Sequence, residues 1–167
     1  MMRPYRIQVC LVVFALMLAA CGAAAGPKAT GPINPGDKIG DLLVTTGDTE
    51  SVKSNWELSC PDEGSEPYSC TAKVGTKVNI SWGTYASPTE DLETTWSEHT
   101  HEIFVNDRPV NLQAFGSVDV VHPHVGEMRY WNVVILARAP GEVAVRNRGV
   151  AGGDPFDSTM TLTFEGP

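Results

Sequence analysis

Residues 130–137 read YWNVVILA, and this stretch decides the fold that the sequence predicts. Its odd-numbered and its even-numbered positions are both largely apolar. Successive side chains of a strand point to opposite faces. A strand with apolar residues at both its odd-numbered and its even-numbered positions is therefore covered on both faces. The stretch therefore predicts a central β-strand.

Alternation of apolar and polar residues recurs on both sides of this stretch. Residues 73–82 (KVGTKVNISW), 143–145 (VAV) and 159–164 (TMTLTF) have the period of two that is typical of half-buried strands. The pair Asn106-Asp107 separates two further short runs. Because Asn and Asp tolerate positive φ, this pair predicts a tight hairpin turn.

One segment has a helical signature. Ser87 is followed by Pro88 and Glu90, which places Ser at the N-cap, Pro at N1 and Glu at N3 of a capping box. This arrangement predicts one short helix near 88–95.

Seven to eight short strands separated by Gly/Pro turns indicate an all-β fold, an antiparallel β-sandwich, with a closed barrel as the alternative. The Pro140-Gly141 turn, followed by a short strand and a terminal alternating strand, is similar to the arrangement in immunoglobulin-like domains. The resemblance implies an immunoglobulin-like architecture and no particular function.

Composition excludes several classes of protein. The chain has 167 residues, Lys+Arg 12, Asp+Glu 20 and a net charge of −8. Nucleic-acid binding and docking on anionic lipid both need clustered Lys and Arg, so the acidic balance argues against either. The apolar fraction of 42% is that of a globular chain rather than a disordered one.

The first residues have the features of an export signal. Arg3 and Arg6 form a positively charged start, and residues 7–20 are almost wholly apolar but short for a membrane span. The run ends in Leu18-Ala19-Ala20-Cys21, which resembles the lipobox of bacterial lipoproteins. An uncleaved membrane anchor and a secretory peptide cleaved elsewhere are the alternatives.

The lipobox resemblance implies a lipid on the Cys21 sulfur and cleavage before this residue. We then expect a signal peptide over 1–20, a lipidated Cys and flexible tether over 21–36, and a β-sandwich domain over 37–167. The protein would be lipid-anchored and extracytoplasmic, at the cell membrane or the outer membrane. Loss of residues 1–20 removes two arginines and changes the net charge to −10.

Two cysteines remain for the domain. Cys60 and Cys70 are ten residues apart, and export to an oxidising compartment favours a disulfide between them. Zinc-binding pairs and redox-active pairs are the alternatives, but both have closer spacing.

The four histidines form two H-x-H motifs, His99/His101 and His122/His124. Residues i and i+2 of a strand face the same way, so two such pairs could complete a tetrahedral Zn or Cu site. Pro123 interrupts the second pair, and surface histidines or a pH sensor are the alternatives.

The four tryptophans divide by their neighbours. Trp82 and Trp131 lie in apolar alternation and are expected in the core. Trp56 and Trp96 lie among polar residues and are the candidates for exposure and ligand contact. The edge of the core is the alternative location that the burial of large aromatic side chains favours.

Hydrolase, phosphate-loop and dinucleotide-binding motifs are absent from the sequence. We therefore expect a noncatalytic lipoprotein that binds a small ligand or a protein partner at the cell envelope. The alternatives are a Zn- or Cu-binding protein or metalloenzyme that uses the two H-x-H pairs, and a carbohydrate-binding module.

Overall fold

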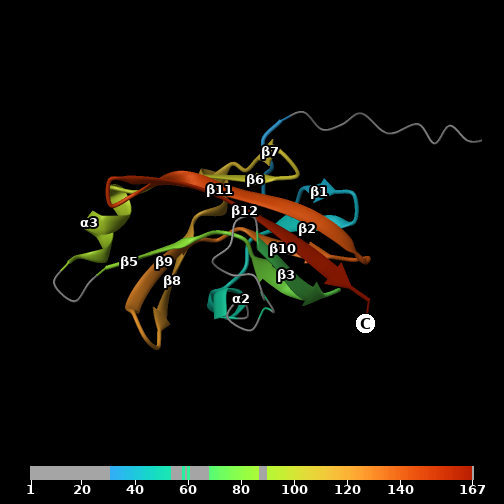
Figure 1. Ribbon diagram of the computed structural model, residues 1–167, viewed down its shortest axis with the longest axis horizontal. Helices are drawn as coiled ribbons and strands as arrows, with labels where there is room; N and C mark the ends of the chain where they lie inside the picture. Colours follow the sequence, from blue (N-terminus) through green and yellow to red (C-terminus); the bar gives the residue numbers. More distant parts are fainter. Residues whose placement is uncertain (1–30, 54–57, 59, 61–67, 87–89, 167) are drawn as a thin grey trace, which may run out of the picture. The chain divides into compact units, whose positions relative to one another are not determined.

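The computed structural model describes residues 31–53, 58, 60, 68–86 and 90–166. These residues form three β-sheets with three short helices beside them (Figure 1). The expectation of an all-β chain is therefore confirmed. The expected leader and the expected lipobox, including Cys21, lie outside the described residues.

The strands are arranged as follows. One sheet has the order β1 (Lys38–Ile39), β2 (Leu42–Thr45), β10 (Val134–Ala137), β4 (Lys77–Asn79). The second has the order β3 (Tyr68–Lys73), β12 (Asp154–Glu165), β11 (Gly141–Ala151), β6 (Thr100–Val105), β7 (Arg108–Pro109). The third has the order β5 (Gly83–Tyr85), β9 (Gly126–Trp131), β8 (Ser117–His122). The helices are α2 (Thr49–Lys53), α3 (Leu92–Ser97) and α4 (Leu112–Phe115).

Strand β10 is the central strand that the sequence predicts. It pairs with β2 on one side and with β4 on the other. Val134 and Ile135 point to opposite faces of the strand, and both are fully buried. Ile135 and Ala137 belong to the core cluster, whereas Val134 on the opposite face is buried outside this cluster.

The predicted strand over 130–137 is nevertheless two strands. β9 ends at Trp131 and pairs with β8, whereas β10 begins at Val134 and belongs to a different sheet. The apolar stretch continues across the break between these two strands, where Val133 is also fully buried. Breaks of this kind give twelve strands among the described residues instead of seven or eight.

Among the named strands of the described residues, pairing is antiparallel with one exception. β12 pairs with β3 in parallel, from Met160 opposite Tyr68 to Glu165 opposite Lys73. β12 pairs with β11 along its whole length in an antiparallel hairpin. The inward residues Met160, Leu162 and Phe164 of β12 are buried, as the period of two predicts.

The predicted helix begins later than expected. Asp91 caps α3 by accepting a hydrogen bond from the backbone N–H of Thr94 at 3.0 Å. The helix runs over Leu92–Ser97 rather than 88–95, and residues 87–89 of the proposed capping box lie outside the described residues. Both α2 and α4 are single turns that the sequence patterns missed.

The hairpin at Asn106-Asp107 is confirmed. Val105 lies opposite Arg108, and the two turn residues have φ of 48° and 63°. This conformation is the one that Asn and Asp tolerate better than other residues with a Cβ. The turn positions β7 against the end of β6.

The folded unit begins before the expected boundary at residue 37. Ile33 is fully buried and forms a parallel bridge with Val110. Its backbone N–H donates to the Pro109 carbonyl at 2.8 Å. Gly and Pro dominate 31–36, so composition hides the single apolar side chain that anchors this segment.

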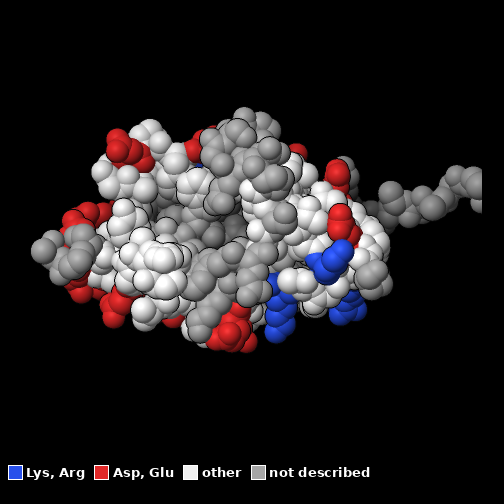
Figure 2. Space-filling view, turned by 60° about the horizontal axis from the view of Figure 1, so that its bottom comes forward, with Lys and Arg blue, Asp and Glu red and all other residues white. Residues whose placement is uncertain are grey.

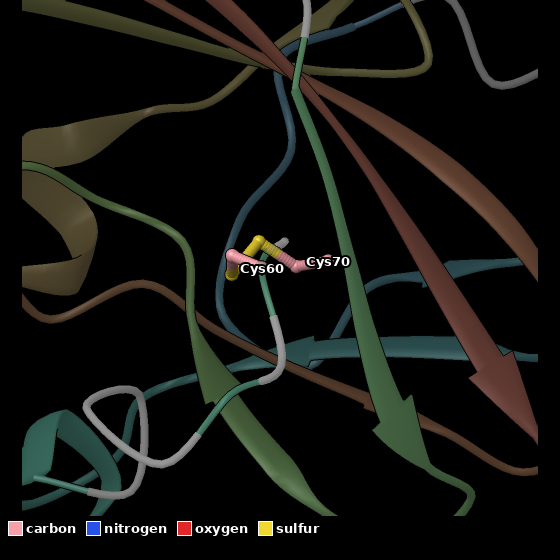
Figure 3. The surroundings of a disulfide bond; sticks show 2 residues. All are labelled: Cys60 and Cys70. Atoms are coloured by element: carbon pink, nitrogen blue, oxygen red, sulfur yellow. A yellow bond between two sulfur atoms is a disulfide. The ribbon is translucent and has the colours of Figure 1, made fainter. Parts of the chain in front are cut away.

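The disulfide between Cys60 and Cys70 is confirmed (Figure 3). Cys70 lies on β3 and is buried against the core, and Cys60 packs beside it from the preceding segment. The bridge ties that segment to the edge of the five-stranded sheet. No helix among the described residues is long and apolar enough to span a membrane.

Gly149 on β11 is required by its neighbours. A Cβ at this position would lie 1.8 Å from the Thr100 carbonyl oxygen and 3.0 Å from Cζ of Phe156. By contrast, nothing lies within 4 Å of a Cβ at Gly141, on the same strand and also without positive φ.

We expect Gly149→Ala to lower the free energy of unfolding by about 3 kcal/mol, because the added methyl group must displace backbone. Gly141→Ala is the matched control and should change stability by less than about 0.5 kcal/mol. Chemical denaturation of both variants measures the difference. Equal stability of the two would contradict the close packing at Gly149.

Candidate functional site

Strand β6 directs His101 toward the inner side of the five-stranded sheet. Ile103 and Val105 follow at alternate positions, and both are buried. On the neighbouring strands, His101 lies opposite Gly149, which in turn lies opposite Phe156. Gly149 has no side chain, so the rings of His101 and Phe156 meet above it, with their centroids 5.5 Å apart.

This contact is one link in a row of five rings that come from four parts of the chain. Trp82 stacks on Phe156 at 5.4 Å with the planes 6° apart. At the other end, Trp96 of α3 lies 5.9 Å from His101 and 5.0 Å from Trp131. The row therefore extends from Trp82 to Trp131 with His101 in the middle.

Arg129 of β9 holds one end of the row in place. Its guanidinium lies over the Trp96 ring at 5.7 Å and pairs with Asp119 and Glu93, each at 2.6 Å. The hydrogen bonds to Arg129 lower the pKa of the Asp119 carboxyl, and the two carboxylates raise that of Arg129. The ion pairs fix α3 on the β8–β9 hairpin, and with it the position of Trp96.

The tryptophans are placed differently from the expectation. Trp82, expected in the core, is 38% exposed. Trp131 is half-buried and packs against the core, and Trp96 is also half-buried, as expected for a residue at the edge of the core. Trp56 lies outside the described residues. The alternating pattern wrongly predicted that Trp82 lies in the core, because β4 ends at Asn79, before this residue.

A cavity of about 430 Å³ lies beside His101. Its walls are β6, the segment from Pro109 to Gln113, and Trp131. His99, Asn111 and Gln113 bring further polar groups to the lining. The cavity thus lies where β6 extends beyond the short strand β7.

Three polar atoms in this wall are buried without a hydrogen bond. They are both ring nitrogens of His101 and the indole nitrogen of Trp131. Buried polar groups in native proteins are nearly always paired, and an unpaired one costs about 1–3 kcal/mol. Two residues beside the cavity therefore have hydrogen-bonding capacity that the described chain does not use, but the three atoms are buried behind the cavity surface and do not face its space.

The lining of the cavity is close to neutral. Burial, with a smaller contribution from the nearby His99, lowers the pKa of His101 to about 4. None of the described lining residues is Lys or Arg. The charged Glu102 pairs with Arg148, so its charge is compensated.

His99 has a defined tautomer. Its Nδ1 lies 2.5 Å from the Thr95 carbonyl oxygen, which only accepts hydrogen bonds. Nδ1 of His99 therefore donates to this oxygen.

The structure does not bring the two H-x-H pairs together. His99 and His101 belong to the β6 region, whereas His122 and His124 lie at the β8–β9 hairpin of another sheet. The His124 backbone N–H donates to Nδ1 of His122 at 3.2 Å. Within the described ranges, no three His, Cys, Asp or Glu side chains are grouped to hold a metal ion.

Sequence reasoning missed the cavity and most of its wall. The sequence marks His101 as a candidate metal ligand and predicts that Trp131 lies in the core. Asn111, Gln113 and Gly149 carry no pattern that marks them, because their relation to His101 arises from the pairing of β6 with β11 and from α4.

We expect the low pKa of His101 to make folding sensitive to acid. Between pH about 4 and 6.5 the unfolded chain binds a proton that the folded chain excludes, so stability decreases as the pH falls through this range. His101→Gln should remove up to about one proton from the uptake on unfolding near pH 5. Denaturant titrations from pH 4 to 8 measure it, with His124→Gln as the exposed control. An unchanged pH slope in His101→Gln would contradict burial of a neutral His101.

Comparison with known proteins gives no relative from which a role could be transferred. No family model, no curated protein and no solved structure matches this chain.

Proposed function

We propose that this protein is a noncatalytic, lipid-anchored lipoprotein of the cell envelope, whose β domain binds a small ligand in the cavity beside His101. The observation that carries the binding role is the cavity itself, which is lined by polar and aromatic side chains that include His99, Asn111 and Trp131. A cavity of this size is also within the range of small-molecule sites, about 300–1,000 Å³.

The anchor is supported by the leader and the lipobox at Leu18-Ala19-Ala20-Cys21. Residues 21–30 supply a Gly/Ala/Pro-rich tether between the lipid and the folded unit, which begins at Gly31. The disulfide between Cys60 and Cys70 suits an oxidising compartment outside the cytoplasm.

The surface charge suits a domain that stands away from the lipid. In the face that Figure 2 shows, acidic side chains are more widespread than basic ones. The formal charge of −10 after removal of residues 1–20 would be repelled by anionic headgroups.

The architecture proposed for the domain is an immunoglobulin-like β-sandwich. Its support is the four-stranded sheet around β10 and the five-stranded sheet around β11, which share one core cluster. Val44 and Ile135 come from the first sheet, and Val145 and Leu162 from the second.

A metal-binding role is less well supported than ligand binding. The four histidines divide between two separate sheets, and His101 lies among aromatic rings rather than beside carboxylates. A metal ion needs all of its ligands at about 2.0–2.3 Å from one point.

The anchor is tested by Cys21→Ala. The native chain should incorporate labelled palmitate and partition into the detergent phase of Triton X-114, because Cys21 carries the lipid. Cys21→Ala should lose both properties, and Cys10→Ala is the matched control that should retain them. Equal labelling of Cys21→Ala and the native chain would refute lipidation at Cys21.

The binding role is tested on the full lipidated chain in lauryldimethylamine oxide micelles. A library of small water-soluble fragments, charged and uncharged, is added while the indole N–H resonance of Trp131 is followed by NMR, with Trp131→Phe to assign it. We expect some fragments to shift this resonance and to leave that of Trp82 in place. If no fragment moves it at millimolar concentration, the cavity is not a binding site.

A further inference from the structure

We propose that the cavity beside His101 binds a short peptide in extended conformation, which adds a strand to the open edge of β6. This inference rests on the ligand-binding function proposed above and names the chemical class of the ligand. The groups that recognise the peptide are main-chain N–H and C=O groups of β6. The buried ring nitrogens of His101 take no part in this recognition.

The cavity lies against the edge of β6 rather than on one face of the sheet. Five consecutive residues of β6, 100–104, line it. Successive side chains of a strand point to opposite faces, so a cavity on one face would touch only every second residue. A cavity that touches all five lies beside the backbone. Because β11 occupies the other edge of β6, the cavity is on the side away from β11.

Two hydrogen bonds show which backbone groups face this side. The Asn106 N–H donates to the Ala144 carbonyl, toward β11, at 2.9 Å. On the other side of β6, the Val110 N–H donates to the Ile103 carbonyl at 2.8 Å. Both backbone groups of one residue in an antiparallel strand point the same way, and the direction alternates from residue to residue. The N–H and C=O of His101 therefore point to the cavity side of β6.

Among the described residues, no strand pairs with β6 beside His101 on the cavity side. β7 ends at Pro109, and Val110 alone continues its pairing with β6. The chain then turns away into α4, where the Leu112 N–H donates back to the Val110 carbonyl at 3.1 Å. An added strand would take the position next to His101 that β7 leaves open.

The surface of His101 supports recognition through its main chain. The residue is partly exposed, although both of its ring nitrogens are buried, so its exposed surface belongs to its main chain and its carbon atoms. Its neighbours Thr100 and Glu102 are exposed, so this part of the edge is accessible to a ligand. Open strand edges are templates for pairing with another chain, and strand addition is a recurring mode of peptide recognition.

The side-chain preferences of the site follow from the pleat of the sheet. The peptide residue opposite His101 would point to the inner side, where Trp131 and Leu112 line the cavity. This position favours an apolar side chain, because a charge there would be desolvated without a partner. The adjacent peptide residues would point outward, beside Glu102. Since Glu102 pairs with Arg148, its charge is compensated, and these outer positions should tolerate either charge.

The test uses the capped peptide acetyl-Thr-Thr-Val-Thr-Thr-amide, whose central valine is its only apolar residue. It is titrated by calorimetry into the full lipidated chain in lauryldimethylamine oxide micelles. Two matched peptides carry one N-methyl group, either on the valine or on the residue after it. When the valine lies opposite His101, its N–H points to β6 and the following N–H points away.

We expect the probe peptide to bind, and N-methylation of its valine to weaken binding at least about tenfold through loss of a main-chain hydrogen bond. The peptide that is methylated on the next residue should bind as the unmethylated one does. Replacing the central valine by aspartate or lysine should also weaken binding at least about tenfold.

Hydrogen exchange of single amides tests the assigned edge. At saturating peptide the His101 amide should exchange at least about tenfold more slowly, because it becomes paired with the added strand. The Glu102 amide points to β11 in the free protein as well, so peptide binding should leave its exchange unchanged.

A pair of variants tests the location of the peptide. Gln113 is exposed and lines the cavity, so Gln113→Trp should occupy part of the space and weaken peptide binding at least about tenfold. Ala114 is exposed on the same helical turn and outside the lining, and Ala114→Trp is the matched control. Thermal melting shows that both variants are folded. Native affinity in folded Gln113→Trp would place the peptide elsewhere and refute the inference.

Three further results would overturn it. One is equal affinity of the two N-methylated peptides, and another is unchanged exchange of the His101 amide when peptide is bound. The third is binding of no peptide while fragments still shift the Trp131 resonance, in which case the cavity binds another class of ligand and the proposed function stands. If neither peptides nor fragments bind, the proposed function fails together with the inference.

Discussion

The close approach of β6 and β11 at Gly149 is the constraint on which the rest of the candidate site depends. A side chain at this position would collide with the Thr100 carbonyl, so β6 could not pair with β11 in the observed register. Without that side chain, His101 and Phe156 meet across the strand between them. The same residue thus permits the sheet to form and the row of rings to be continuous.

This row extends the influence of Gly149 to the other sheet. Trp96 lies between His101 and Trp131, and Arg129 holds Trp96 through its ion pairs to α3 and β8. The ion pairs themselves are partly exposed and contribute little free energy each. Their effect is geometric, because they orient the helix that carries the central tryptophan.

Local patterns predicted those elements whose signals lie within a few residues of each other. The hairpin at Asn106-Asp107 follows from residues that tolerate positive φ, and the disulfide follows from the two cysteines that lie outside the expected leader and lipobox. The burial of β12 follows from strict alternation. The predicted start of α3 was wrong because the segment 87–91 contains two residues that can cap a helix, Ser87 and Asp91. In the structure, Asp91 caps the helix. The burial of Ile33 was not predicted because a single apolar residue cannot form a periodic pattern.

The sequence by itself determined that the chain is all-β, with β10 at its centre, because the period of two and the two-sided apolar stretch are properties of neighbouring residues. It also determined the hairpin turn and the pairing of Cys60 with Cys70. Only the tertiary structure decided that residues 130–137 contribute to strands of two different sheets. It also decided that His101 contacts Phe156 rather than His122. These relations join residues from distant parts of the chain, and their cause is strand register, which no local pattern encodes.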